Sequence, residues 1–210
     1  MRALSVLALT AALVPGLAAA AAEREWSFRV LLDGSEVGTH TFRVEERDGE
    51  RRVASDARFT VKFLFFDAYT YVHRARERWQ GDCLARIEAR TDDNGKALAV
   101  RGERRGAHFE VSGKVGAERL PGCVMSFAYW NPKMLAQPRL LNAQTGEYTE
   151  VKIEPRGEET LSVRGAPLRA RRYVLHAEDF RIDLWYAAGD EWVQLESRTS
   201  GGRALRYLIQ

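Results

Sequence analysis

The chain has 210 residues, of which 45% are hydrophobic, 29% charged and 10% aromatic, and its formal net charge at pH 7 is +3. This composition excludes a disordered chain, because burial of so much apolar surface can offset the entropy lost when the backbone orders. The small basic excess is spread over charges of both signs, whereas nucleic-acid binding needs clustered Lys and Arg. We therefore expect a globular protein that does not bind nucleic acid.

The first 22 residues have the pattern of a cleaved secretory signal peptide. Arg2 precedes an apolar run over 3–14, and an alanine-rich tract with small-x-small triplets ends before Glu23. The run is too short to span a bilayer, and no later segment approaches the roughly 18 apolar residues of a membrane helix. The sequence thus predicts export to the periplasm, with 1–22 as signal peptide, 23–210 as a single antiparallel β-domain and no transmembrane segment after cleavage.

Cys83 and Cys123 are the only cysteines of the chain. An exported protein lies in an oxidising compartment, where two such thiols tend to pair. The alternatives, a reactive thiol or a metal ligand, lack the CxxC spacing and the neighbouring His that would support them. We expect a disulfide that stabilises the fold by about 4 kcal/mol in the chain-entropy model.

Period-two alternation of apolar and polar residues begins at Trp26 and predicts consecutive antiparallel strands. Asp33-Gly34 and Asp48-Gly49 are typical hairpin turns, Asp67-Ala68 is expected to reverse the chain, and the run Asp92-Asp93-Asn94-Gly95 closes another hairpin. The strand segments expected between these turns are 26–32, 37–46, 52–66, 69–80, 84–91, 97–104 and 108–112.

The middle of the chain differs, because alternation is lost over 122–141. Asn131-Pro132 reads as an N-cap followed by proline at the first helical position, and Pro138 prevents a long continuation. We expect a short helix in a long connection, whose aromatic residues are buried over one opening or edge of the sheet. Strands then resume with 147–154 and 160–164 and continue to 209.

These elements predict an all-β fold with minor α content. About eleven strands cannot form one flat sheet, because strand twist makes large open sheets curl or close. We expect a strongly curved antiparallel sheet, a half-barrel or barrel of about eleven strands with one short helical insertion.

The run Glu77-Arg78-Trp79-Gln80-Gly81-Asp82-Cys83-Leu84, followed by Thr91-Asp92-Asp93-Asn94-Gly95, resembles a signature of uncharacterised exported bacterial proteins, a domain-of-unknown-function family. The opening Gly34 and Val37-Gly38 and the ending Asp183-Leu184-Trp185-Tyr186, Trp192-Val193 and Tyr207 are similar to it as well. The resemblance implies a periplasmic antiparallel β-fold without an assigned activity, so it assigns no functional residue. A more distant likeness to half-barrel lipoprotein carriers is an analogy of shape.

No pattern of catalytic or metal-binding residues stands out. The histidines His40, His73, His108 and His176 have no metal-ligand spacing, and no phosphate-cradling glycine pattern is present. Arg74, Arg76 and Arg78 share one strand face, which indicates a solvated face or, alternatively, contact with anionic lipid. We therefore predict no metal and no cofactor, and we place no catalytic group.

The aromatic residues carry the strongest indication of binding. Seven of the 21 aromatic residues fall between Phe59 and Trp79, and around Phe63-Leu64-Phe65-Phe66 both strand faces are apolar. Such a segment either packs under the long connection or lines a cavity for a ligand. The side chains predicted to form an apolar wall are Phe63, Phe65, Phe66, Tyr69, Tyr71, Phe127, Tyr129, Trp130 and Met134.

The sequence favours a noncatalytic periplasmic protein that binds a hydrophobic or lipidic ligand, or another apolar small molecule, or serves an envelope protein as partner. Two alternatives stay open. One is an envelope enzyme whose catalytic groups are not placed, and the other is a protein-interaction module that uses an exposed sheet edge.

Overall fold

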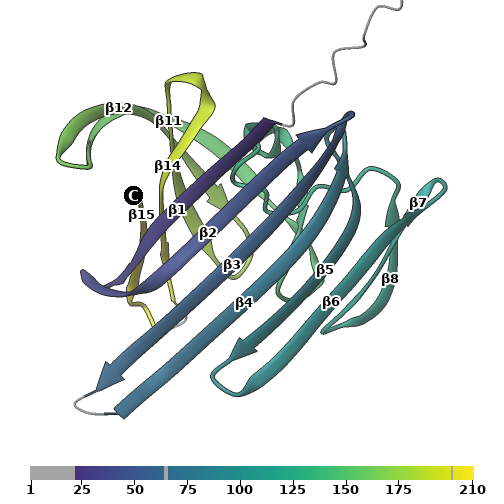
Figure 1. The fold of residues 1–210 in the computed structure, drawn as a ribbon, viewed down its shortest axis with the longest axis horizontal. Coiled ribbons are helices and arrows are strands. Elements are labelled where there is room, and N and C mark those ends of the chain that lie inside the picture. Colours follow the sequence, from purple (N-terminus) through teal and green to yellow (C-terminus); the bar gives the residue numbers. More distant parts are fainter. Residues whose placement is uncertain (1–21, 64–65, 200) are drawn as a thin grey trace, which may run out of the picture.

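The computed structural model describes residues 22–63, 66–199 and 201–210 and consists almost entirely of antiparallel strands (Figure 1). The strands before the long connection are β1 (Ala22–Leu32), β2 (Ser35–Arg47), β3 (Glu50–Phe63), β4 (Phe66–Gln80), β5 (Cys83–Asp93), β6 (Lys96–Arg105), β7 (His108–Gly113) and β8 (Gly116–Pro121). The strands after it are β11 (Lys152–Val163), β12 (Ala166–His176), β13 (Arg181–Ala187), β14 (Glu191–Arg198) and β15 (Ala204–Ile209).

The connection between these two sets carries three short elements. They are a 3-10 helix, η1 (Pro132–Ala136), and two paired strands, β9 (Arg139–Leu141) and β10 (Tyr148–Glu150). The side chain of Asn131 accepts a hydrogen bond from the Lys133 backbone N–H, so the expected N-cap is present. A second one-turn helix, η2 (Ala188–Asp190), joins β13 to β14.

The tight turns follow from their residues. Asp33 and Asn94 have φ values of +50° and +52°, and the glycine after each also has positive φ, which is the backbone of a type I′ hairpin turn. Only short polar residues and glycine adopt this conformation without strain, which is why these dipeptides could be recognised in the sequence.

The thirteen strands of the main sheet form one continuous antiparallel order, β11-β12-β13-β14-β15-β1-β2-β3-β4-β5-β6-β7-β8. The last strand, β15, pairs with the first, β1, with Phe28 opposite Ile209 and Leu32 opposite Leu205. This pairing joins two meanders into one sheet, whose edges are β8 and β11. In Figure 1, β1 to β6 cross the front, and the strands on either side curl back from them. The sheet is not closed and fits the predicted half-barrel.

The connection lies against the inner face of this sheet and completes the core. Its buried residues Val124, Met125 and Met134 belong to one cluster with inward-facing residues of the sheet. Cys83 at the start of β5 forms a disulfide with Cys123, and the Leu84 N–H donates to the Val124 carbonyl at 2.8 Å. The disulfide, which the two cysteines predicted, fixes the start of the connection to the sheet.

Three predictions about the elements need correction. Asp67 and Ala68 do not form the predicted turn but lie in β4, where Asp67 pairs with Lys62. The strands predicted at 147–154 and 160–164 have other bounds. β10 ends at Glu150, and β11 continues through Pro155 to Val163, because a bulge between Pro155 and Gly157 lets the strand stay paired past the proline. The short strands β8 and β9 were not expected, because β8 buries only one of its residues and so shows no alternation, and β9 has only three residues.

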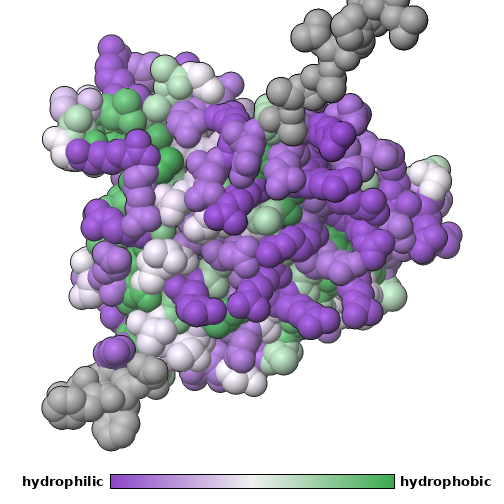
Figure 2. Space-filling view, viewed as in Figure 1, coloured by the Kyte–Doolittle hydropathy of each residue, from purple (hydrophilic) through white to green (hydrophobic). Residues whose placement is uncertain are grey.

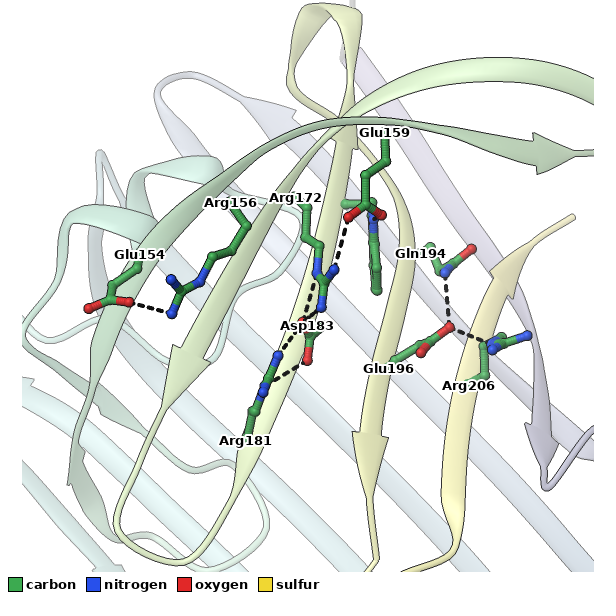
Figure 3. Close-up of polar contacts among 10 residues, drawn as sticks. Glu154, Arg156, Glu159, Arg172, Arg181, Asp183, Gln194, Glu196 and Arg206 are labelled. Atoms are coloured by element: carbon green, nitrogen blue, oxygen red, sulfur yellow. Dashed lines mark hydrogen bonds and ion pairs between the residues drawn. The ribbon is translucent and has the colours of Figure 1, made fainter.

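The outer face of the sheet is polar. Seen from the side of β1 to β6, hydrophilic side chains dominate it (Figure 2), and Arg74 and Arg76 lie 3.6 and 3.0 Å from the carboxylate of Asp56. On the outer face of β12 and β13, Arg172 lies between Glu159 and Asp183, at 2.9 and 2.6 Å (Figure 3). These charges are neutralised within the fold, which indicates a structural role. In the part of the chain described, no helix has the length and apolar character needed to cross a membrane.

Candidate ligand-binding cavity

Small side chains border a hollow on the inner face of β2, β3 and β4. Ser55, Ala75 and Ala89 face one another across β3, β4 and β5, and Ala57 lies in the next row. All four are buried. Because such side chains cannot fill the space beneath the connection, a cavity of about 310 Å³ remains between connection and sheet. This volume lies at the lower end of the range of small-molecule sites, roughly 300–1,000 Å³.

The cavity is bounded by the sheet, by the connection and by the turn before β13. The sheet contributes His40, Phe42, Val53, Ser55, Tyr71, His73, Ala75, Glu77, Ile182 and Tyr207. The connection contributes Ser126, Phe127, Ala128, Tyr129, Trp130, Asn142, Ala143 and Gln144, and Phe180 completes the wall. Larger hollows on the outer face, such as one of about 600 Å³ over β4 to β6, run among the exposed arginines.

One end of the cavity holds a buried carboxyl group. Glu77 is only 9% exposed, and its Oε2 accepts a hydrogen bond of 2.9 Å from the Trp79 indole N–H. Burial raises the pKa of Glu77 to about 7, although the hydrogen bonds from Trp79 and Ser126 oppose the rise. Trp130 packs edge-on against Trp79 at 5.4 Å, so an aromatic pair borders this carboxyl group.

Two histidines occupy the other end. His40 on β2 and His73 on β4 flank Ala57, which pairs with both of them across β3. The His40 Nε2 lies 2.7 Å from the Ser55 hydroxyl, and the His73 Nδ1 lies 2.8 Å from the Thr91 hydroxyl. Burial lowers the pKa of His40 to about 3 and that of His73 to about 4, so both imidazoles are neutral at neutral pH.

The Nδ1 atom of His40 is buried and has no hydrogen-bond partner among the described residues. Buried polar atoms are nearly always paired, so an unpartnered one beside a cavity marks a place where a ligand or solvent molecule can bind. Near it, the Tyr71 hydroxyl donates to the Gln144 side chain at 2.9 Å, and the Tyr207 ring lies 5.6 Å from the His40 ring. This end of the cavity therefore combines aromatic surface with a buried polar atom, His40 Nδ1, that has no hydrogen-bond partner among the described residues.

The charge of the cavity follows from its lining. Among the described residues that bound it, Glu77 is the only carboxylic acid, and none is Lys or Arg. The described residues also hold no group of three or more His, Cys, Asp and Glu side chains placed to bind a metal ion. The arrangement can therefore bind an apolar body and offer hydrogen bonds to it, with one titratable acid at one end.

The structure brings together part of the predicted aromatic wall. Tyr71, Phe127, Tyr129 and Trp130 line the cavity. Met134 is fully buried in the core but does not reach the lining, and Tyr69 donates to Asp93 at 2.7 Å outside it. Phe65 and the side chains of Phe63 and Phe66 lie outside the described residues.

Sequence reasoning missed the polar residues of the cavity, although one signal for them was present. If Arg74, Arg76 and Arg78 face outward, then His73, Ala75 and Glu77 must face the core. A histidine and a glutamate on a buried strand face are uncommon, and together they indicate a functional site. The partners His40 and Ser55 carried no such signal, because only the pairing of β2 with β3 and of β3 with β4 brings them to the same site as His73 and Glu77.

Comparison with known proteins agrees with this architecture. The chain is similar in fold to the crystal structure of a β-barrel-like protein of domain of unknown function DUF1849 from Brucella abortus, with a TM-score of 0.64. The two are 8% identical in sequence, and the match covers 89% of this chain and 94% of that one, so the likeness concerns the fold alone. No curated protein matches the chain. A family model, the domain of unknown function DUF6134, matches residues 28–210. The half-barrel described here, with its cavity between sheet and connection, therefore belongs to a member of the DUF6134 family.

Proposed function

We propose that this protein is exported to the periplasm and binds a small hydrophobic or lipidic molecule, without chemical conversion, in the cavity between the sheet and the connection. The observation that carries the proposal is the cavity itself, about 310 Å³ in volume and bordered by Tyr71, Phe127, Tyr129 and Trp130. Small-molecule sites are typically apolar hollows with a few placed polar groups. Its size suits a compact ligand or one short chain and not a whole multi-chain lipid.

Two features support export. Residues 1–22 have the sequence of a cleaved signal peptide, and the Cys83–Cys123 disulfide is typical of an oxidising compartment. A periplasmic carrier would meet ligands released from the envelope, which is the source of hydrophobic molecules closest to it.

The enzyme alternative has one observation in its favour, the 2.7 Å contact between His40 and Ser55. In a nucleophilic pair of this kind a carboxylate usually orients the imidazole through its second nitrogen. No such partner contacts the His40 Nδ1 among the described residues, and the lowered pKa of His40 makes it a weak base. The contact between His40 and Ser55 is therefore better explained by ligand binding than by catalysis.

The interaction-module alternative depends on the free edges of the sheet, β8 and β11. β11 contains Pro155 beside a bulge, and β8 ends at Pro121. Proline and bulges are devices that hinder the pairing of edge strands with other chains. These edges are thus less suited to strand addition than the cavity is to a ligand.

A cavity-filling variant tests the proposal. Ala75→Leu places a larger side chain on the cavity floor, and we expect the affinity for the hydrophobic dye N-phenyl-1-naphthylamine, measured by fluorescence titration, to fall at least about tenfold. Ala54→Leu is the matched control, because Ala54 lies on the neighbouring strand and opposite Arg76, on the outer face. Equal affinity of the Ala75 variant and the wild type would show that the dye binds elsewhere and would contradict the proposal.

Native mass spectrometry provides the complementary measurement. Protein purified gently from its own periplasm is expected to carry a bound small molecule, and the Ala75→Leu variant is expected to lack it. Bare wild-type protein under these conditions would count against a carrier.

A further inference from the structure

The carboxyl group of Glu77 has no counter-charge within the cavity. Among the described residues that line the cavity, no other side chain carries a full charge at neutral pH, since both histidines are neutral. On the inner face of β4, the titratable group nearest to Glu77 is His73, four residues away, which at the rise of a strand is about 13 Å. Glu77 is thus an isolated acid in apolar surroundings, and such groups are found mainly where function requires them.

One basic side chain near Glu77 in the strand pairing, two residues from its partner Val53, is already engaged. Arg51 on β3 lies with its guanidinium 5.1 Å from the centre of the Trp130 ring, but its NH2 is 3.0 Å from the Asp82 carboxylate and also donates to the Gly81 carbonyl. Lys133 lies 2.7 Å from the same Asp82. Neither side chain lines the cavity, so neither neutralises Glu77 from inside it.

The hydrogen bonds at Glu77 suit the ionised form. The Trp79 indole N–H and the Ser126 hydroxyl both donate to it, and donors of this kind stabilise a carboxylate. Burial works in the opposite direction, and the balance leaves the pKa of Glu77 at about 7. A cation that entered the cavity would supply the attraction that the empty site lacks, and the π faces of Phe127 and Trp130 on the wall would add to it.

We propose that the cavity selects ligands that carry a positively charged amine, with the ammonium group against the Glu77 carboxylate and the apolar part along Ala75 toward the histidine end. The inference rests on the proposed function, because it names the class of ligand for the same cavity. An anionic head group, such as a fatty-acid carboxylate or a phosphate, would meet Glu77 and find no Lys or Arg on the lining. A neutral head group would supply no positive charge to the Glu77 carboxylate.

A head-group series with one common tail tests this selection. Octylammonium, 1-octanol and octanoate share an eight-carbon chain and differ in charge. In mildly alkaline buffer, where Glu77 is ionised, isothermal titration calorimetry on the wild-type protein is expected to give an affinity for octylammonium at least about tenfold higher than for 1-octanol. Octanoate is expected to bind weakest.

The substitution Glu77→Gln keeps an acceptor for the Trp79 indole and removes the charge. We expect it to abolish the preference for octylammonium over 1-octanol while the affinity for 1-octanol changes little. Glu88→Gln, on the outer face opposite Arg76, is the control and should preserve the preference. The wild-type series stands without the variant, so a failure of Glu77→Gln to fold does not prevent the test.

The outcomes separate the two proposals. Equal binding of all three compounds, or tightest binding of octanoate, would overturn the amine selection and leave the cavity as a binding site. Binding of none of them, together with no effect of Ala75→Leu on dye affinity, would overturn the proposed function as well. Preference for octylammonium that survives Glu77→Gln would assign the cation to another site and contradict the inference.

Discussion

The inner face of the sheet has two regions that share the alternation of inward and outward side chains but differ in how the space inside is filled. Over β5 to β8 it is filled by large side chains, among them Ile87, Phe109 and Leu120, which pack under the start of the connection near the disulfide. Over β2 to β4 it carries Ser55 and Ala75 and leaves the cavity. We call these the filled region and the hollow region. The comparison teaches that alternation fixes which residues face inward, whereas side-chain volume decides whether a core or a site results.

The largest expected effect concerns the filled region and its disulfide. Replacing Cys83 and Cys123 by alanine releases a loop with a sequence separation of 40, which in the chain-entropy model lowers the free energy of unfolding by about 4 kcal/mol. Urea denaturation of the double variant and of the wild type under oxidising conditions measures the difference. Addition of a reductant to the wild type should reproduce the loss, and a reductant should not affect the variant. An unchanged denaturation midpoint would show that packing alone holds the connection in place.

The next largest effect concerns the hollow region, where the buried His73 makes the free energy of unfolding depend on pH. Burial lowers the pKa of His73 from 6.5 to about 4, so between these values the unfolded chain binds more protons than the folded one. The free energy of unfolding therefore falls as the pH decreases from about 6.5 to 4, by up to about 3 kcal/mol for this group. His73→Gln should remove this part of the acid sensitivity, which denaturation curves at several pH values will measure.

Two further groups must be considered in that measurement. His40 acts in the same direction as His73, whereas Glu77 acts in the opposite one: its pKa is raised from 4.5 to about 7, so the stability it contributes is present at low pH and is lost as the pH rises through 7. The difference between His73→Gln and the wild type isolates one imidazole. His108→Gln, an exposed position on β7 of the filled region, is the control. Parallel pH profiles for all three proteins would contradict the assignment of a buried neutral histidine to the cavity.

The smallest expected effect compares the two regions directly. A Cβ atom added at Gly102 in the filled region would lie 2.5 Å from Cε1 of the fully buried Phe109, so Gly102→Ala should cost about 1–3 kcal/mol of unfolding free energy through overpacking. Ala75→Val in the hollow region adds volume to a cavity on a strand that favours branched residues, so its effect should be below about 0.5 kcal/mol. Thermal denaturation of both variants checks the contrast. Similar losses in the two variants would mean that the hollow region is as tightly packed as the filled one.

Much of the fold could be predicted from the sequence, because its information is local. Alternation located most strands, Asp33-Gly34 and Asn94-Gly95 located turns, and Asn131-Pro132 located the helix. The disulfide followed from there being two cysteines in an expected export context. The strand β8 was missed because only one of its residues is buried, so it shows no alternation, and the bulge at Pro155 was missed because it is a local irregularity without a period.

The candidate site was predicted only in part, for a different reason. Four aromatic residues expected in the wall do line the cavity, but its polar residues come from strands and a connection that meet only in the folded chain. Period-two alternation tells which face a side chain is on and not which neighbour it has. His40 meets Ser55 through the pairing of β2 with β3, and Glu77 meets Ser126 because the connection folds back onto the sheet.

By itself, the sequence determined an antiparallel β-fold, its turns and the inward or outward direction of most side chains, because strand geometry repeats every two residues. Only the tertiary structure decided that β15 pairs with β1, which makes one sheet of two meanders and brings Tyr207 beside His40. It also decided that the connection lies over small residues of the sheet, Ser55 and Ala75. Both are long-range packing choices, made by the fit of surfaces that are distant in the chain, and the cavity is their consequence.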